Sequence, residues 1–516
     1  MSTLGGCSDR EIAELACIAG VGGVAMAGIG QTARAPFTAQ VLARTDSWPW
    51  PDYLRSFACA WDVCRAAWLP PGNLGSLVRR RWQSLVAFAR DRSAFYHELY
   101  AGVREHDLEN LSALPIVTKT MIMSGFDKLV TSPALQRRAL EAFIADPQWA
   151  GRPFAGGFAV WTSSGTSGEP GIFVHDASAL AVYDALQLYR FRGAAASMEL
   201  GVTSLALGRF ALVAATGGHF AGAASVERLR SMFPWMAQRL RVITLIQPLD
   251  MLVAELNAYR PNLIATYPSA AAMLAQEQQA GRLRIDPTQV WTGGECLSEA
   301  TRQIVQETFG ADVRDEYGAS EFASIAVGCP AGWLHVNADW VVLEPVDDQY
   351  QPVAPGQPSH TVLLTNLANR AQPLIRYDLG DSITVRADPC ECGNRLPAIH
   401  VHGRGDDLLE LHGRGGVAVQ LLPLALTTVL EEGAGLYDFQ LVQLGPRALR
   451  LHVGVREHAK ADRARSALRR FLDCQGLDGI QIDHGTEPPR CKGPGGKLRR
   501  IIRESEQHEA ELATNP

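Results

Sequence analysis

The chain has 516 residues, of which 47% are hydrophobic, enough to fill the cores of about two to four domains. This composition argues against global disorder. The formal net charge of −6 argues against a nucleic-acid-binding protein, whose binding domain would usually be basic.

Residues 1–44 are predicted to form an extension that precedes the folded domains. Their most apolar run, residues 17–30, is shorter than the roughly 18 residues of a membrane-spanning helix, and it follows acidic residues rather than the basic start of a signal peptide. No membrane span is therefore expected. The ten cysteines are too few and too scattered for a disulfide scaffold, which favours a reducing cytoplasm.

Residues 45–150 are predicted to be mainly helical, and the pattern changes near residue 158. Between Leu77 and Val103 the spacing of apolar residues is typical of a helix with one buried face. From residue 158, β-rich runs alternate with helical runs. Strands are predicted at 157–161, 171–174, 210–215, 241–246, 263–266, 289–292 and 312–316, and helices at 177–192, 249–259, 269–280 and 298–309. This alternation predicts the α/β class, with a parallel sheet covered on both faces.

After Tyr317 the chain becomes β-rich, with strand-like runs at 340–344, 361–365, 374–377 and 382–386. Residues 403–407 resemble a linker. Beyond them a small α+β unit is predicted, with strands at 439–444 and 449–455 and a helix at 459–471. The expected division is a large domain over 45–403, with its ligand site in 158–403, and a small mobile C-terminal domain over 404–516.

The segment 161–170, WTSSGTSGEP, combines hydroxyl side chains with two glycines. Hydroxyls donate hydrogen bonds, and glycine lets backbone N–H groups approach an anion closely, so the segment has the parts of a phosphate-binding loop. Glu169 stands where a phosphate-binding lysine would be expected, which excludes the ordinary P-loop pattern. A plain flexible loop has the same composition and is the alternative.

Three polar segments follow predicted strands. The hydroxyl-rich loop comes after Val160, Gly293-Gly294-Glu295 ends the strand at 289–292, and Tyr317 ends the strand at 312–316. Ligands of α/β sheets bind where strands end and loops begin. This placement favours a nucleotide site over a plain loop.

Six motifs stand in a defined order along the chain: TSSGTSGEP (162–170), TGGE (292–295), DEYGASE (315–321), LIRYDLGD (374–381), GRGDD (403–407) and GGKLRR (495–500). This order resembles the adenylate-forming superfamily, and more closely its phenylacetate–CoA ligase and capsule-biosynthesis-like branch. Residues 113–133 are similar to the same branch. The resemblance covers roughly residues 75–500.

The resemblance implies that ATP and Mg²⁺ bind, and it gives each motif a role. Tyr317, followed by Gly318, would stack on adenine, Ser320 would donate to the α-phosphate, and Glu321 would hold Mg²⁺. Asp381 would accept hydrogen bonds from the ribose, and Arg404 would reach ribose or phosphate. The remaining nucleotide-binding positions are Thr162, Ser163, Ser164, Gly165, Thr166, Ser167, Gly168, Gly293, Gly294 and Glu295.

The resemblance also implies a catalytic lysine on a rotating domain. Lys497 would stabilise the carboxylate and phosphate charges as an acyl-adenylate forms, with Lys492 as the competing candidate. Asp406 would be the hinge of the rotation. Glu169 departs from the family, in which many members have lysine. The loop would then grip phosphate through its hydroxyls and amides alone.

A zinc site is predicted from three cysteines and a histidine. Cys329 and His335 lie in CPAGWLH, and Cys390 and Cys392 form a C-x-C turn, which together make a complete tetrahedral Zn²⁺ ligand set. On spacing alone, buried thiols explain the pattern equally well. The resemblance favours structural zinc, and His400 and His402 are alternative fourth ligands.

The acyl pocket is expected, by resemblance, at His219, Tyr267 and Pro268. The implied function is ATP-dependent activation of an aryl or acyl carboxylic acid to an acyl-adenylate, then transfer to the thiol of coenzyme A. A carrier-protein thiol or an amine is the alternative acceptor, and a weakly active nucleotide-binding homologue is the alternative from another class. The expected partners are these small molecules, and a homodimer is left open.

Overall fold

The computed structural model describes residue 48 and residues 53–66, 69–163, 171–190, 208–402, 409–413, 417–485, 489 and 499–503. Several predicted site residues lie outside these ranges: Ser164, Gly165, Thr166, Ser167, Gly168, Arg404, Asp406 and Lys497. Within the described residues, no helix combines the length and the apolar character needed to cross a bilayer.

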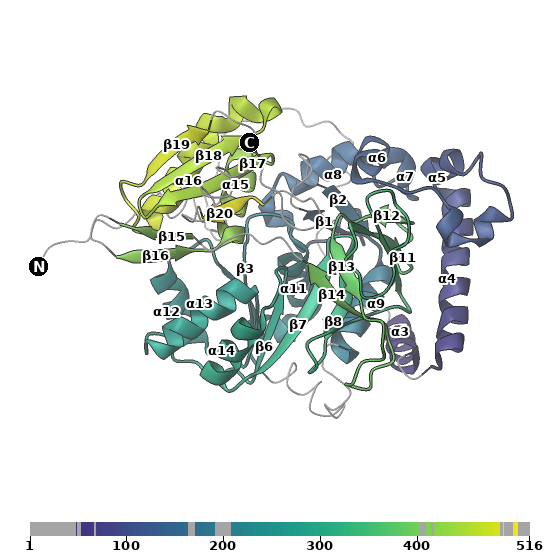
Figure 1. Cartoon of the computed structure of the whole chain (residues 1–516), viewed down its shortest axis with the longest axis horizontal. Helices are drawn as coiled ribbons and strands as arrows, with labels where there is room; N and C mark the ends of the chain where they lie inside the picture. The colour runs from purple at the N-terminus through teal and green to yellow at the C-terminus, as the bar shows by residue number, and fades with distance from the viewer. Residues whose placement is uncertain are drawn as a thin grey trace, which may run out of the picture.

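The N-terminal part is helical, as predicted. It contains α3 (Tyr53–Ala66), α4 (Pro71–Arg92), α5 (Ala94–Leu99), α6 (Lys119–Ser124), α7 (Phe126–Leu129) and α8 (Arg137–Ile144). Helix α4 begins at Pro71, because proline is tolerated in the first helical turn. Ser93 then starts α5 by accepting a hydrogen bond from the Tyr96 backbone N–H. Figure 1 shows α3, α4 and α5 along one edge of the molecule.

The large sheet has the strand order β13-β14-β9-β8-β7-β6-β5-β3-β4. Its parallel half consists of β3 (Phe210–Ala214), β4 (Leu240–Thr244), β5 (Leu263–Thr266), β6 (Gln289–Gly293) and β7 (Asp312–Ala319). Helices α11 (Ala221–Met232), α12 (Leu249–Tyr259), α13 (Pro268–Gln279) and α14 (Glu299–Phe309) connect these strands. The predicted parallel α/β sheet is therefore confirmed.

Alternate residues of the parallel strands pack against different helices. Val213 and Ile264 share a core with Leu256 of α12 and with residues of α13 and α14. Phe210 packs instead with Val226 of α11. Because side chains of a strand alternate between the two faces, α12–α14 cover one face of the sheet and α11 covers the other.

The other half of the large sheet is antiparallel, and of its strands the sequence indicated only the one at 382–386. It consists of β8 (Phe322–Gly328), β9 (Leu334–Val336), β14 (Ala398–His402) and β13 (Ser382–Val385). Helix α9 (Ala177–Tyr189) packs on this half: Leu186 of α9 lies in one core with Ile325 and Ile399.

Smaller strand pairs flank the large sheet. They are β1 (Ala159–Ser163) with β2 (Gly171–His175), β10 (Val341–Val346) with β11 (Thr361–Asn366) and β12 (Tyr377–Asp378), and β15 (Leu409–His412) with β16 (Ala418–Leu421). The strand predicted over 374–377 is wrong. Arg376 takes a left-handed φ of 50°, and its backbone N–H donates to the Thr365 hydroxyl, so extended structure begins only at Tyr377.

The C-terminal part contains the predicted α+β elements, and its apolar residues belong to one core cluster with those of the parallel half of the large sheet. Its sheet has the order β19-β18-β17-β20, built from β17 (Phe439–Gly445), β18 (Ala448–Val453), β19 (Gln481–Gly485) and β20 (Ile501–Arg503). Helices α15 (Pro423–Ala434) and α16 (Ala461–Cys474) pack on it. Figure 1 shows this layer above the large sheet, and the Gln475 side chain donates to the Ile246 carbonyl just after β4, at 3.2 Å.

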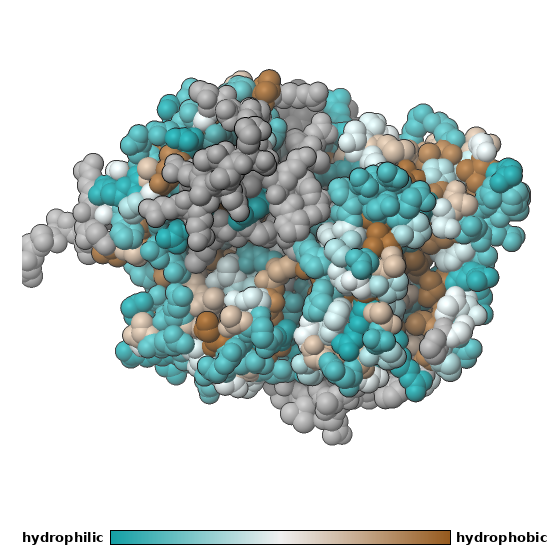
Figure 2. All heavy atoms as spheres, viewed as in Figure 1, coloured by the Kyte–Doolittle hydropathy of each residue, from teal (hydrophilic) through white to brown (hydrophobic). Residues whose placement is uncertain are grey.

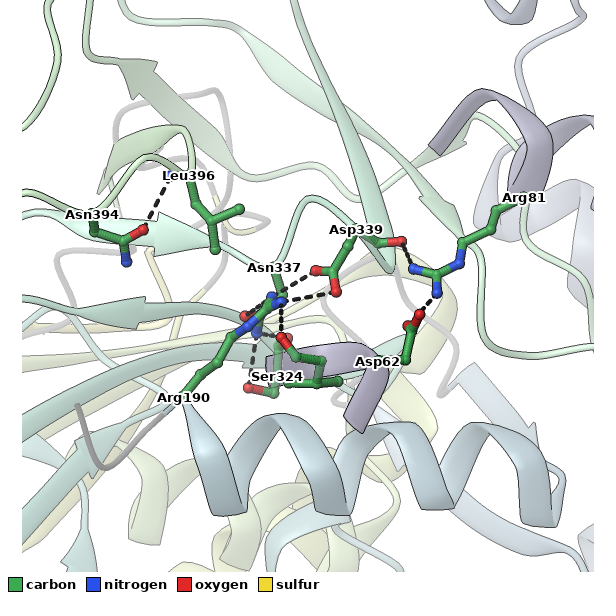
Figure 3. Close-up of polar contacts among 9 residues, drawn as sticks. Asp62, Arg81, Arg190, Ser324, Asn337, Asp339, Asn394 and Leu396 are labelled. Atoms are coloured by element: carbon green, nitrogen blue, oxygen red, sulfur yellow. Dashed lines mark hydrogen bonds and ion pairs between the residues drawn. The ribbon is translucent and has the colours of Figure 1, made fainter. Parts of the chain in front are cut away.

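A buried ion pair joins the end of α9 to the segment between β9 and β10, and the N-terminal helices contact it. Arg190, at the end of α9, makes two hydrogen bonds of 2.6 and 2.8 Å to the carboxylate of Asp339, whose side chain is fully buried. Arg81 of α4 donates to the Asp339 carbonyl and also pairs with Asp62 of α3 (Figure 3). Hydrophilic residues cover most of the described surface seen in Figure 2.

Candidate active site

The motif DEYGASE forms the end of β7 and the tight turn into β8. Ala319 pairs with Phe322, so Ser320 and Glu321 are the two turn residues. Gly318 is required here, because a Cβ at this position would collide with the Ala323 carbonyl of the neighbouring strand. The hairpin therefore presents Tyr317, Ser320 and Glu321 at the edge of the sheet where β6 also ends.

Tyr317 and Asp381, separated by 64 residues, meet at this edge. The phenol hydroxyl donates a 2.7 Å hydrogen bond to Asp381 Oδ2. Burial raises the pKa of Tyr317 well above its usual range, and the Asp381 charge adds to the effect, so the phenol stays protonated and acts as a donor. The structure thus brings the predicted adenine-binding and ribose-binding residues together.

The base of the hydroxyl-rich loop joins the same turn. Thr162 and Ser163 end β1, and the Ser320 hydroxyl donates to the Thr162 carbonyl at 3.0 Å. The Thr162 backbone N–H donates to the His219 carbonyl at 2.9 Å. His175 of β2 contacts the Ser320 carbonyl through Nε2, at 2.9 Å. These bonds fix the start of the predicted phosphate loop beside Ser320.

Glu321 has the environment of a ligand for a divalent cation. It is 6% exposed, and the Tyr377 side chain hydrogen-bonds to it. Burial raises the pKa of its carboxyl, and the nearby Asp381 charge raises it further, whereas the Lys119 charge lowers it. The buried Glu321 carboxylate and the partly exposed Asp381 carboxylate repel each other, and a dication at this point would relieve the repulsion. The residues present therefore fit Mg²⁺.

The segment Gly293-Gly294-Glu295 leads out of β6 and contacts the start of α13, where the predicted acyl-pocket residue Tyr267 lies. Gly294 has a φ of +79°, and a Cβ there would lie 3.2 Å from the Tyr267 ring. The Glu295 carboxylate accepts a 3.0 Å hydrogen bond from the Ser269 backbone N–H at the start of α13. Glu295 thus holds α13 against β6, and its predicted contact with the nucleotide stays a prediction.

The three predicted acyl-pocket residues take different positions. His219 is 1% exposed, with Nε2 3.2 Å from the Asp146 carbonyl and its ring against Phe143. The Tyr267 hydroxyl accepts from the Ala215 backbone N–H at 3.3 Å, and burial raises the pKa of Tyr267 to about 12. Pro268 is buried as the first residue of α13. Their roles toward a substrate stay predictions.

Two residues of the site were missed by the sequence reasoning. Tyr377, which bonds Glu321, lies within the motif LIRYDLGD, and Lys119 lies within the family-like segment 113–133. Both stretches had been noted for their resemblance, but nothing in either stretch indicates a contact with Glu321.

The predicted zinc ligands lie together at one end of the antiparallel strands. The ligand atoms of Cys329, His335, Cys390 and Cys392 are all within 4.8 Å of one another. The sulfurs of Cys329 and Cys390 are 3.8 Å apart, close to the separation of about 3.7 Å expected for two thiolates bound tetrahedrally to one Zn²⁺. His335 Nδ1 donates to the Leu396 carbonyl at 2.8 Å, which leaves Nε2 for a metal.

The alternative zinc ligands, His400 and His402, have other contacts. The His400 ring stacks on Trp333 with centroids 3.7 Å apart, and His402 Nε2 lies 2.8 Å from the Thr384 hydroxyl. Neither His400 nor His402 belongs to the cluster of possible metal ligands found among the described residues.

Glu432 of α15 reaches from the C-terminal layer to the loop after β3. Its Oε1 would lie 3.0 Å from a Cβ on Gly218, next to His219. Burial raises the pKa of Glu432 to about 7, and the charge of Glu431 adds to it. The neutral acid is therefore favoured in the folded protein. Below the ordinary carboxyl pKa, the protonated Glu432 side chain makes its full contribution to the stability of the fold. This contribution is lost as the pH rises through 7.

We expect Glu432→Gln to raise the thermal midpoint at pH 8, by about 2 °C or more, and to change it little at pH 5, because glutamine stays neutral. Thermal unfolding of both proteins from pH 5 to 8.5 measures this. Glu431→Gln is the control, because Glu431 pairs with buried Arg500, and it should lower the midpoint at every pH. Parallel pH profiles for wild type and Glu432→Gln would contradict the expectation.

Comparison with known proteins identifies similar chains. No family model matches. The phenylacetate-coenzyme A ligase of Thermus thermophilus is 26% identical over 468 residues, which span 84% of this chain and 97% of that protein. Protein CapK of Staphylococcus aureus is 22% identical over 188 residues, or 34% of this chain and 39% of CapK.

Solved structures share the fold. A 2-hydroxyisobutyryl-CoA ligase, in complex with 2-HIB-AMP and CoA in the thioesterification state, has a TM-score of 0.52 and 20% identity, covering 86% of this chain and 92% of that one. The same ligase in the postadenylation state has a TM-score of 0.51. The sequence likeness to a phenylacetate-coenzyme A ligase over most of both chains, and the fold shared with a CoA ligase, agree with the resemblance to the adenylate-forming superfamily that the ordered motifs indicate.

Proposed function

We propose that the chain is an AMP-forming acid–thiol ligase, which activates an aryl or acyl carboxylic acid with ATP and transfers it to coenzyme A. The observation that carries the proposal is the convergence at the β7–β8 turn. There Tyr317 bonds Asp381 at 2.7 Å, Ser320 bonds the start of the hydroxyl-rich loop, and Glu321 is buried with a second carboxylate nearby. A ring, hydroxyl donors and paired carboxylates in one place suit a magnesium nucleotide.

The proposed reaction has two steps. An oxygen of the substrate carboxylate forms a bond to the α-phosphorus of ATP, and the bond to pyrophosphate breaks, which leaves an acyl-adenylate. A thiolate sulfur then bonds to the acyl carbon, and AMP leaves. Magnesium, when bound, neutralises phosphate charge. Tyr317 and Asp381 would hold the nucleoside, and Ser320 would orient the α-phosphate.

The likeness to relatives supports coenzyme A as the acceptor. The Thermus relative is named a coenzyme A ligase, and the 2-hydroxyisobutyryl-CoA ligase structure contains both an acyl-AMP and CoA. By the resemblance of residues 403–407 and 495–500, the segment 404–516 would rotate about Asp406 between the steps, removing Lys497 and admitting the thiol.

Product analysis tests the proposal. The purified protein is incubated with ATP, Mg²⁺, coenzyme A and each of a panel of aryl and fatty acids, and AMP and acyl-CoA are measured by mass spectrometry. The expected result is equimolar AMP and thioester with at least one acid and none without acid. AMP without thioester, restored by a carrier protein or an amine, would indicate a different acceptor.

We further propose that Cys329, His335, Cys390 and Cys392 hold a structural Zn²⁺. Support comes from their clustered ligand atoms and from the donor bond that orients His335. The site would tie the loop after β8, which carries Cys329, to the segment before β14, which carries Cys390 and Cys392. Zinc in such a site contributes stability directly.

We expect the protein, purified without chelators, to contain about one zinc per chain by elemental analysis. Cys392→Ser should retain less than half of that zinc and unfold at a lower temperature, because one of its ligands is lost. Cys64→Ser, in α3 and distant in sequence from the cluster, is the matched control and should keep both values. Wild-type protein without stoichiometric zinc would contradict the proposal.

A further inference from the structure

The hydroxyl-rich loop contains no lysine, and the structure places a lysine from another element at its base. Ser163 and Gly171 are paired residues of β1 and β2, so they mark the two ends of the loop. A Cβ on Gly171 would lie 2.8 Å from the Ser163 hydroxyl and 3.0 Å from Cε of Lys119. The Phe173 ring is closer still to this point, at 2.6 Å, so the end of the Lys119 side chain lies near Ser163 in a crowded spot where only glycine fits at position 171.

Main-chain hydrogen bonds hold Lys119 in this place. The Val117 N–H donates to the Arg376 carbonyl at 3.0 Å, and the Asp378 N–H donates to the Val117 carbonyl at 2.8 Å. The segment before α6 is thereby attached to the segment that carries Tyr377. Lys119 and Tyr377 consequently emerge from adjoining backbone, and both side chains interact with the Glu321 carboxylate.

The charges around Lys119 suit a bound polyanion. Lys119 is a cation whose charge acts on the Glu321 carboxylate. Lys119 is thus near both Ser163, at the base of the loop, and the carboxylate expected to hold Mg²⁺. Helix stability does not explain a cation at this position, because Lys119 is the first residue of α6, where the helix dipole favours negative charge. A flexible ammonium with three donors is well suited to phosphate oxygens.

We propose that Lys119 binds the β- and γ-phosphates of ATP and stabilises the pyrophosphate that leaves as the acyl-adenylate forms. Lys119 lies outside the loop and would supply the positive charge that the loop lacks, because Glu169 stands where many family members have lysine. This inference rests on the proposed function. As the bond between the α-phosphorus and pyrophosphate breaks, negative charge grows on pyrophosphate, and the Lys119 ammonium donates hydrogen bonds to it without transferring a proton.

The test compares Lys119→Met and Lys119→Arg with wild type and with Lys128→Met. Lys128 is an exposed lysine of α7 paired with Glu98, which makes it a matched control. For each protein, the dissociation constants of Mg-ATP and of AMP are measured by calorimetry, and ATP–pyrophosphate exchange is measured with an accepted acid. AMP has no β- and γ-phosphates, so it separates phosphate binding from damage to the nucleoside site.

Lys119→Met should weaken ATP binding about 10-fold or more, leave AMP binding within about twofold, and lower exchange about 100-fold. Lys119→Arg should recover part of the loss, and Lys128→Met should match wild type. The proposal would be overturned if Lys119→Met weakened the binding of ATP and of AMP equally. It would also be overturned if this variant kept the ATP affinity and the exchange rate of wild type. If wild type catalyses no exchange with any acid, the proposed function fails, and the ratio of ATP to AMP affinity still decides the role of Lys119.

Discussion

Glu321→Gln is expected to lower acid-dependent ATP–pyrophosphate exchange by about 100-fold or more. Glutamine keeps the shape of the buried side chain and can still accept a hydrogen bond from Tyr377, but it removes the negative charge that would hold Mg²⁺ beside the phosphates. Exchange is measured over a range of Mg²⁺ concentrations. The apparent Mg²⁺ affinity should fall together with the maximal rate, because the change removes a ligand of the ion.

Glu307→Gln is the control for loss of a negative charge, because Glu307 is exposed on α14. This substitution should leave the maximal exchange rate and the apparent Mg²⁺ affinity unchanged. Removing a buried carboxylate whose pKa burial has raised should not lower the stability of the fold, so the thermal midpoint of Glu321→Gln is expected to equal or exceed that of wild type. Full exchange by folded Glu321→Gln at every Mg²⁺ concentration would contradict the magnesium role of this residue.

Lys497→Ala is expected to reduce formation of the acyl-adenylate by about 100-fold or more, while ATP binding changes little. Lys497 lies outside the described residues, and the expectation rests on the family resemblance of residues 495–500. In the proposed cycle this lysine serves only the first step. Thioester formation from a synthetic acyl-adenylate should therefore proceed at nearly the wild-type rate, which separates the two half-reactions.

Lys492→Ala is the matched control for Lys497→Ala, because it removes the neighbouring lysine of the same segment. It should retain adenylation. The assignment would be reversed if Lys492→Ala lost the first half-reaction while Lys497→Ala kept it.

The parallel half of the fold could be predicted closely from the sequence, because each strand and helix there is a local pattern. The helix at 249–259 and the strand at 263–266 have the predicted bounds. In the antiparallel half the strand at 382–386 could be predicted, but the hairpin from β7 to β8 could not. There β7 continues through Tyr317 and Gly318 into a two-residue turn, which depends on the close approach at Ala323 rather than on periodicity. The apolar run 374–377 was misleading because backbone contacts of Arg376 override its strand propensity.

The site could be predicted as a set of strand-end motifs but not as a set of contacts. Tyr317 and Asp381 were each proposed for nucleotide binding, yet the hydrogen bond between them joins distant parts of the chain and has no local signal. The same holds for Lys119 beside Glu321, which depends on bonds between Val117 and the backbone around Tyr377. The predicted zinc ligands were the exception, since their chemistry together with the family resemblance selected a set that the fold brings together.

The central claim is that this chain forms acyl-adenylates, and exchange of labelled pyrophosphate into ATP tests it most directly. The purified protein is assayed with Mg-ATP and single acids from an aryl and fatty-acid panel, in the absence of coenzyme A. The predicted result is exchange that depends on one group of related acids and stops when either the acid or Mg²⁺ is omitted. Folded protein that binds ATP but catalyses no exchange with any acid would contradict the claim.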